Sequence, residues 1–103
     1  MATLNDLPNI GEVLAQQLRQ VGIETPQQLR AAGSRDAFLR IRLQVDETAC
    51  LHKLYALQGA VEGVRYTQLS VQTKQQLKQF FNSLTAQQQA GELAATLLPL
   101  ALL

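Results

Sequence analysis

Signals that start and stop α-helices recur at short intervals along this chain, and no stretch keeps the sustained apolar–polar alternation of a β-strand. Gly22, Gly33 and Gly63 each follow an apolar-periodic stretch, where glycine commonly supplies the left-handed residue that ends a helix. Helices with one apolar face bury it by packing on one another. The chain is therefore predicted to be all-α, a compact bundle of about five to six short helices forming one domain over residues 4–84.

The most specific local pattern is a turn at residues 7–11 that leads into an amphipathic helix. Asn9 is predicted to be the N-cap of this helix, and Glu12, three residues later, completes a capping box. The apolar face of the helix consists of Ile10, Leu14, Leu18 and Val21. A short turn over residues 4–7, with Thr3 as its cap, precedes the helix, so the N-terminal unit is predicted to be helix-hairpin-helix-like.

Other residues are predicted to cap helices farther along the chain. Thr25 begins a second capping box with Gln28, and Pro26 takes the first helical position. Ser34 is expected to cap a third helix and Ser70 the last one. These caps leave only short connections between successive helices.

The longest helix is predicted over residues 47–62, opened by Asp46 or Thr48. One side of this helix carries large apolar residues and the other carries small ones, so neighbours are expected on both sides. Since glycine inside a helix costs about 1 kcal/mol relative to alanine, Gly59 predicts that a second helix approaches closely there. The predicted core consists of Leu14, Leu18, Phe38, Ile41, Leu51, Leu54, Leu57, Leu77 and Phe80.

The net charge argues against strong autonomous DNA binding. Nine Lys and Arg stand against eight Asp and Glu, a formal net charge of +1, whereas proteins that hold DNA alone usually show a clear basic excess. The single cysteine, Cys50, excludes an intrachain disulfide and fits a reducing compartment. No secretory signal pattern opens the chain, so a cytoplasmic location without membrane contact is expected.

The sequence has no pattern that is typical of catalysis or of metal binding. His52 stands alone and is expected at a solvated or boundary position, while Cys50 lies on an apolar stripe and is expected in the core. Zinc-ligand spacing, a phosphate-binding loop and the Gly-x-Gly-x-x-Gly fingerprint are all absent from the sequence. We therefore predict that the chain is not an enzyme and does not need a cofactor.

The predicted hairpin is the candidate nucleic-acid site. Backbone N–H groups near Gly11 and Val13, at a helix N-terminus, would hold one DNA phosphate. Glu12 opposes this function because its carboxylate would repel the phosphate. The residues that would form such a site are Asn9, Ile10, Gly11, Val13, Arg19, Arg35, Arg42 and Lys53. Because the chain is close to neutral, contact with a protein partner is the favoured hypothesis, and weak DNA binding is the alternative.

Residues 85–103 differ in kind from the rest of the chain, being rich in Gln at first and then apolar, with Glu92 as the only charge. The apolar part is too short for a bilayer span, which needs about 20 residues. We expect it either to dock on the chain's own core or to form the contact of a homodimer. Its candidate interface residues are Leu97, Leu98 and Leu100.

The chain resembles the TfoX C-terminal domain family, and the stretches that carry the resemblance are residues 7–11, 21–23, 37–41 and 50–66. Family members commonly carry Trp where this chain has Tyr66, a change that keeps an amphipathic aromatic ring. The resemblance implies a bacterial, all-helical, non-catalytic domain of the kind found in transcriptional coactivators that regulate natural competence. Longer members have a separate N-terminal domain, which is not expected here, and the residues after Leu84 have no counterpart in the family pattern.

Overall fold

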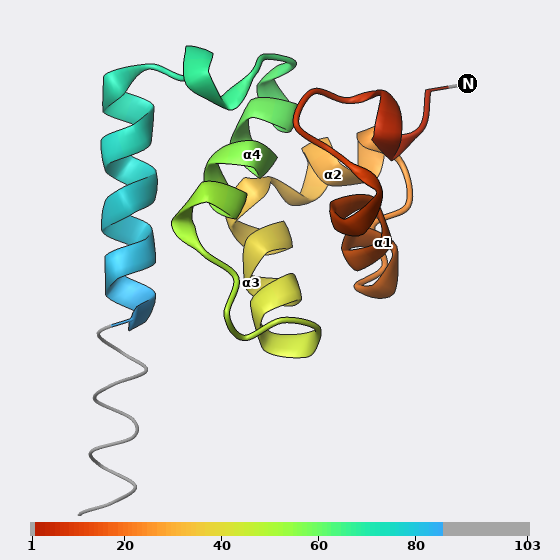
Figure 1. Cartoon of the computed structure of the whole chain (residues 1–103), viewed down its shortest axis with the longest axis horizontal. Coiled ribbons are helices and arrows are strands. Elements are labelled where there is room, and N and C mark those ends of the chain that lie inside the picture. Colours follow the sequence, from red (N-terminus) through yellow and green to blue (C-terminus); the bar gives the residue numbers. More distant parts are fainter. Residues whose placement is uncertain (1, 86–103) are drawn as a thin grey trace, which may run out of the picture.

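The computed structural model describes residues 2–85, and each regular element in that part of the chain is a helix (Figure 1). The elements follow in the order η1 (Leu4–Asp6), α1 (Glu12–Gln20), α2 (Pro26–Ala32), α3 (Ser34–Gln44), α4 (Leu51–Glu62), η2 (Tyr66–Gln68) and a last helix over residues 71–85. The prediction of an all-α bundle of short helices is confirmed. Within residues 2–85, no helix combines the length and the hydrophobicity that a bilayer span requires.

Helix α1 begins at Glu12 with Gly11 as its N-cap, so the prediction that Asn9 caps this helix is wrong. Asn9 lies two residues before the cap with a φ of 70°, and its side chain is bonded to segments far along the chain. The Glu12 carboxylate does not reach back to Asn9. It accepts hydrogen bonds from the side chains of Asn5 (3.1 Å) and Gln16 (3.3 Å).

The ends of three helices lie at glycines, as predicted. Gly22 follows α1 with a φ of 85°, and the next N–H, from Ile23, donates to the carbonyl of Leu18 at 2.9 Å. This bond closes the last turn of α1 in the manner of a Schellman motif. Helix α2 ends at Gly33 and helix α4 at Gly63, which has a φ of 78°.

Two of the predicted side-chain caps are confirmed. The Gln28 N–H donates to the hydroxyl oxygen of Thr25 (3.1 Å), and the Thr73 N–H donates to that of Ser70 (3.0 Å). The capping box at α2 differs in one detail, because the Gln28 side chain accepts from the N–H of Glu24 rather than from that of Thr25. Short polar side chains therefore start α2 and the 71–85 helix.

Ser34 is not the cap of α3, contrary to the prediction. Gly33 takes the N-cap position, and Ser34 is the first helical residue. Its side chain is buried, and its hydroxyl donates to Oε1 of Gln58 on α4 at 2.5 Å. A buried hydroxyl needs a hydrogen-bond partner, and Gln58 on α4 supplies one for Ser34.

Helix α4 begins at Leu51, about one turn later than predicted, with Cys50 as its N-cap. Neither Asp46 nor Thr48 opens it. The Asp46 carboxylate accepts hydrogen bonds from the Thr48 N–H (3.0 Å) and from the Thr48 hydroxyl (2.5 Å). These bonds fold the two residues into a local turn, which competes with helix formation at this point.

The core follows the predicted helical faces closely. The predicted core residues that are buried are Leu14, Leu18, Phe38, Ile41, Leu54, Leu57 and Leu77. Leu51 and Phe80 are only partly buried at its edge. The helical period therefore identified the buried faces, with two exceptions: Leu51 at the start of α4 and Phe80 within the 71–85 helix.

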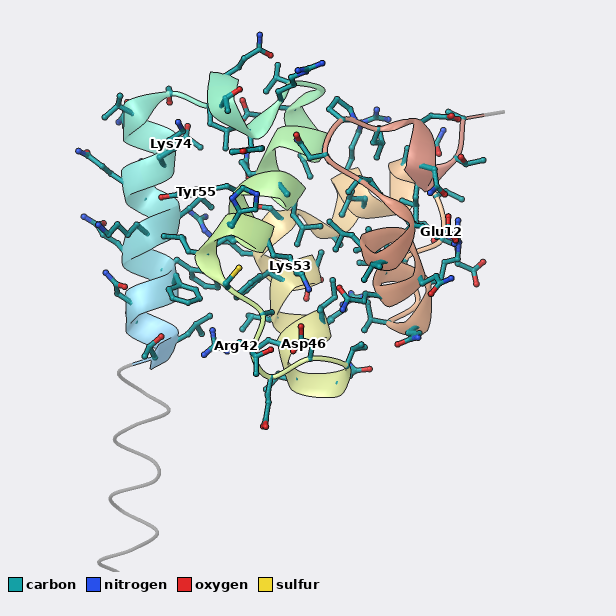
Figure 2. All side chains as sticks on the ribbon, viewed as in Figure 1. Glu12, Arg42, Asp46, Lys53, Tyr55 and Lys74 are labelled. Carbon is teal, nitrogen blue, oxygen red and sulfur yellow. The ribbon has the colours of Figure 1, made fainter. Side chains whose placement is uncertain are left out.

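Helices α3 and α4 stand at the centre of the bundle, with α1 on one side of them and the 71–85 helix on the other (Figure 1). The 71–85 helix contacts α3 through Phe81, whose ring meets that of Phe38 edge-on at 6.1 Å. It contacts α4 through the Tyr55 hydroxyl, which donates to the carbonyl of Lys74 at 3.3 Å (Figure 2). The 71–85 helix therefore packs against both central helices.

Replacing Leu54 by Ala tests the central position of α4. The Leu54 side chain is 0% exposed, so Leu54→Ala is expected to lower the free energy of unfolding by about 2–5 kcal/mol, which urea titration would measure. Val13→Ala is the control, because Val13 is 71% exposed and its truncation is expected to change stability by less than about 0.5 kcal/mol. Equal stabilities of the two variants would contradict the packing described here.

Candidate functional site

Asn9 joins three segments of the chain through one side chain. Its Nδ2 group donates to the carbonyls of Ala56 (3.3 Å) and Val64 (3.0 Å), and its Oδ1 accepts from the N–H of Tyr66 (3.1 Å). We call these bonds the Asn9 clamp. Asn is one of the few residues that tolerate a positive φ, so the backbone can turn here while the side chain reaches α4 and η2.

Gly59 makes room for the Asn9 clamp. A Cβ atom at Gly59 would lie 2.5 Å from Nδ2 of Asn9 and 2.7 Å from the carbonyl oxygen of Val64. Gly59 was predicted to admit a second helix, and that prediction is wrong in its partner. The close neighbours at Gly59 are the turn before α1 and the loop after α4.

A cavity of about 260 Å³ opens beside the Asn9 clamp, between the start of α1 and the first turns of α4. We call it the hairpin pocket. The residues that line it are Asn9, Leu14, Cys50, His52, Lys53, Ala56 and Tyr66. The ring of His52 meets that of Tyr66 edge-on, with 4.4 Å between the centroids. Most of the surface that these side chains expose to the pocket is carbon.

The lysine of the hairpin pocket is already paired. Lys53 Nζ donates to Oε1 of Gln17 on α1 at 2.8 Å and lies 3.4 Å from the carboxylate of Asp46 (Figure 2). Hydrogen bonds from the side chain and backbone of Thr48 lower the pKa of Asp46 below its ordinary value, and Lys53 adds to this effect. Asp46 is consequently ionised at neutral pH and offsets the charge of Lys53.

The structure separates the hairpin residues that were predicted to bind nucleic acid. The side chain of Asn9 is used by the clamp, and Ile10 is buried in the core. Gly11 and Val13 are exposed at the start of α1, where no side chain caps the helix. The carboxylate of Glu12 lies in the same first turn. The start of α1 thus offers backbone N–H groups together with a negative charge.

The three predicted arginines do not gather in one place. Arg19 donates to the side-chain oxygen of Asn5 in η1, and the amide group of Asn5 donates to the carboxylate of Glu12 at the start of α1. Arg35 and Arg42 lie over the rings of Phe80 (5.7 Å) and Phe81 (5.2 Å) in the 71–85 helix. Figure 2 shows Arg42 near the end of α3, on the opposite side of the bundle from Glu12. Of the predicted cationic residues, Lys53 is the one that joins Asn9 in a common cavity.

Cys50 is exposed, so its predicted place in the core is wrong. The physical reason is the late start of α4, which leaves Cys50 as an extended N-cap outside the apolar stripe. His52 is exposed, as expected for a solvated position. Within residues 2–85, no group of three or more potential metal ligands comes together. The predicted interface residues Leu97, Leu98 and Leu100 lie outside the described residues.

Ala56 and Tyr66 were not predicted to be site residues. Gly59, which lies between them in the sequence, signalled a close approach. Their joint position with Asn9 depends on how the turn before α1 meets the end of α4. A pattern confined to one helix does not contain that information.

Comparison with known proteins assigns relatives to this fold. The sequence profile of the TfoX C-terminal domain family matches residues 1–81. Protein Sxy of Escherichia coli is 35% identical over 86 residues, which cover 84% of this chain and 41% of Sxy. The chain therefore spans less than half the length of that relative.

Two solved structures share both sequence and fold with the chain. The triclinic crystal form of an uncharacterized protein from Listeria monocytogenes is 49% identical, with a TM-score of 0.80 and coverage of 82% of this chain and 94% of that one. The tetragonal form of a Listeria monocytogenes protein of unknown function is also 49% identical, with a TM-score of 0.76 and coverage of 79% and 98%.

Substitutions at Asn9 test the clamp. Asn9→Gly keeps the positive φ but removes the side-chain bonds, so we expect a loss of about 1–3 kcal/mol in the free energy of unfolding. Asn9→Ala also forces alanine into a left-handed conformation and should cost roughly 1 kcal/mol more. Gln16→Ala, an exposed change on α1, is the control. An Asn9→Gly variant as stable as the parent would show that the clamp contributes nothing.

Proposed function

The chain belongs to the TfoX C-terminal domain family, and we propose that it is a non-enzymatic regulatory module that acts by contacting a protein partner. The process we propose for it is the transcriptional regulation of competence, which its resemblance to the family implies. Because the chain matches 41% of Sxy, the activity of such a longer protein is carried over here as part of the proposal.

The observation that carries the proposal is the carbon-lined hairpin pocket. Leu14, Ala56 and the rings of His52 and Tyr66 contribute to its wall, and its cation, Lys53, is paired with Asp46. An apolar side chain of a protein partner gains by leaving water for such a hollow. A phosphate gains little there, because it needs cations or N–H groups that are free to bind it.

The alternative is weak binding of DNA through the start of α1. One observation favours it, namely that Gly11 is exposed and no side chain caps the helix. The positive end of a helix dipole attracts phosphate. Against it stand the carboxylate of Glu12 in the first turn and the net charge of +1. Non-specific affinity for DNA depends mainly on a basic excess, which this chain lacks.

Fluorescence anisotropy of a labelled DNA duplex distinguishes the two mechanisms. For a protein-contact module, we expect no saturable binding at micromolar protein, either at about 50 mM or at about 150 mM salt. The matched variant is Gly11→Phe, chosen because Gly11 is exposed and a Cβ there meets no atom within 4 Å. Micromolar binding that weakens with salt, and that the folded variant loses, would establish the DNA mechanism instead.

A genetic test addresses the regulatory function itself. Removing the coding sequence from its bacterium is expected to lower transformation by added DNA, and the parent chain should restore it. Gly11→Phe should restore it equally, whereas Cys50→Trp should not, because a bulky ring at this exposed position would cover the hairpin pocket. Cys50→Ser is the size-matched control. Unchanged transformation after removal would refute a role in competence.

A further inference from the structure

We propose that the hairpin pocket has an occupant within the same chain, the apolar segment of residues 93–103. In this arrangement Leu97, Leu98 and Leu100 supply the side chains that enter the pocket. The inference goes beyond the proposed function, because it assigns a competitor to the surface at which a partner would bind. It rests on the pocket and on the sequence of residues 86–103, whichever partner the module contacts.

The apolar composition of residues 93–103 matches the apolar part of the hairpin pocket. Leu14, Ala56 and the rings of His52 and Tyr66 contribute to the wall of the hairpin pocket, together with the polar side chains of Asn9, Cys50 and Lys53. At about 260 Å³ it lies just below the range of roughly 300–1,000 Å³ that is usual for pockets that bind small ligands, so it suits a few aliphatic side chains. Residues 93–103 contain no charged side chain. A segment of that composition lowers its free energy by leaving water.

The described chain ends within reach of the hairpin pocket. Phe81, one turn before the last described residue, lies under the guanidinium of Arg42 at 5.2 Å. Arg42 in turn donates to the carbonyl of Ala49 at 3.4 Å, and the next residue, Cys50, lines the pocket. Residues 86–103 would span roughly 60 Å if fully extended, far more than this short series of contacts requires.

The chain's own segment has an advantage over the same segment of a second copy. A short connection, here residues 86–92, holds an attached group at an effective concentration in the millimolar range. A second copy at micromolar concentration would compete poorly against it. The same reasoning implies that an external partner must present a better-fitting apolar surface than residues 93–103 in order to displace them.

Cys50 provides a built-in reporter of this contact. It is the single cysteine of the sequence, it is exposed in residues 2–85, and it lines the hairpin pocket. An occupant in the pocket should slow the reaction of its thiol with iodoacetamide, which intact mass measurement follows in the full chain. If residues 93–103 cover it, the rate reports how often they leave the pocket.

The decisive variant replaces Leu97, Leu98 and Leu100 together by Asp. We expect its Cys50 to be labelled at least roughly tenfold faster than that of the parent, because aspartate would not enter an apolar pocket. The control replaces Gln87, Gln88 and Gln89 by Asp, which adds the same charge outside the apolar segment and should leave the rate unchanged. Circular dichroism would verify that both variants are folded.

Three results would overturn the proposal. Equal labelling rates in the parent and the leucine variant would show that the segment does not cover Cys50. Protection that rises with protein concentration would show that a second copy supplies the segment. If the methyl resonances of Leu14 and Ala56 are the same in the parent and in the leucine variant, residues 93–103 do not contact the pocket wall. None of these measurements involves DNA or a partner, so their failure is distinct from failure of the proposed function.

Discussion

The structure depends on one asparagine that is bonded across the chain. Through Asn9, the turn before α1 is attached to α4 and to the loop that leads into η2. The hydrogen bonds are partly buried, where a lost partner costs more than it does in water. Gly59 is the complement of Asn9, because any side chain there would occupy the space of the clamp. The hairpin pocket exists beside this junction and takes its shape from it.

Sequence patterns predicted the features that local chemistry determines. The ends of α1 and α4 at Gly22 and Gly63 were predicted because glycine, which has no Cβ, adopts a positive φ readily wherever it stands. The cap at Thr25 was predicted because the hydroxyl bonds to an N–H three residues away. The buried faces of the helices followed from their period, as Leu54 and its neighbours on α4 show.

Two of the predictions that were wrong involve side chains whose partners are distant in sequence. Asn9 and Ser34 are residue types that commonly cap helices. The side chain of each instead forms hydrogen bonds with a segment that only the tertiary fold brings near. The candidate site shows the same limit. Lys53 was named as a candidate and Tyr66 was not, and the two share a cavity because the end of α4 returns to the start of α1. Arg35 was named together with the hairpin residues, whereas its guanidinium extends from α3 to the ring of Phe80 in the 71–85 helix.

The chemistry of the Asn9 clamp makes the fold sensitive to ageing of a single amide. Asparagine is one of the chemically labile residues, because its side-chain amide can deamidate to aspartate over time. In the clamp, the Nδ2 group faces the carbonyl oxygens of Ala56 and Val64. Hydrolysis would replace this donor by an anionic oxygen of nearly the same size, set against two other oxygens. Replacing the NH₂ group by an oxygen would hardly change the shape of the side chain, but it would turn the attraction between the turn and α4 into repulsion.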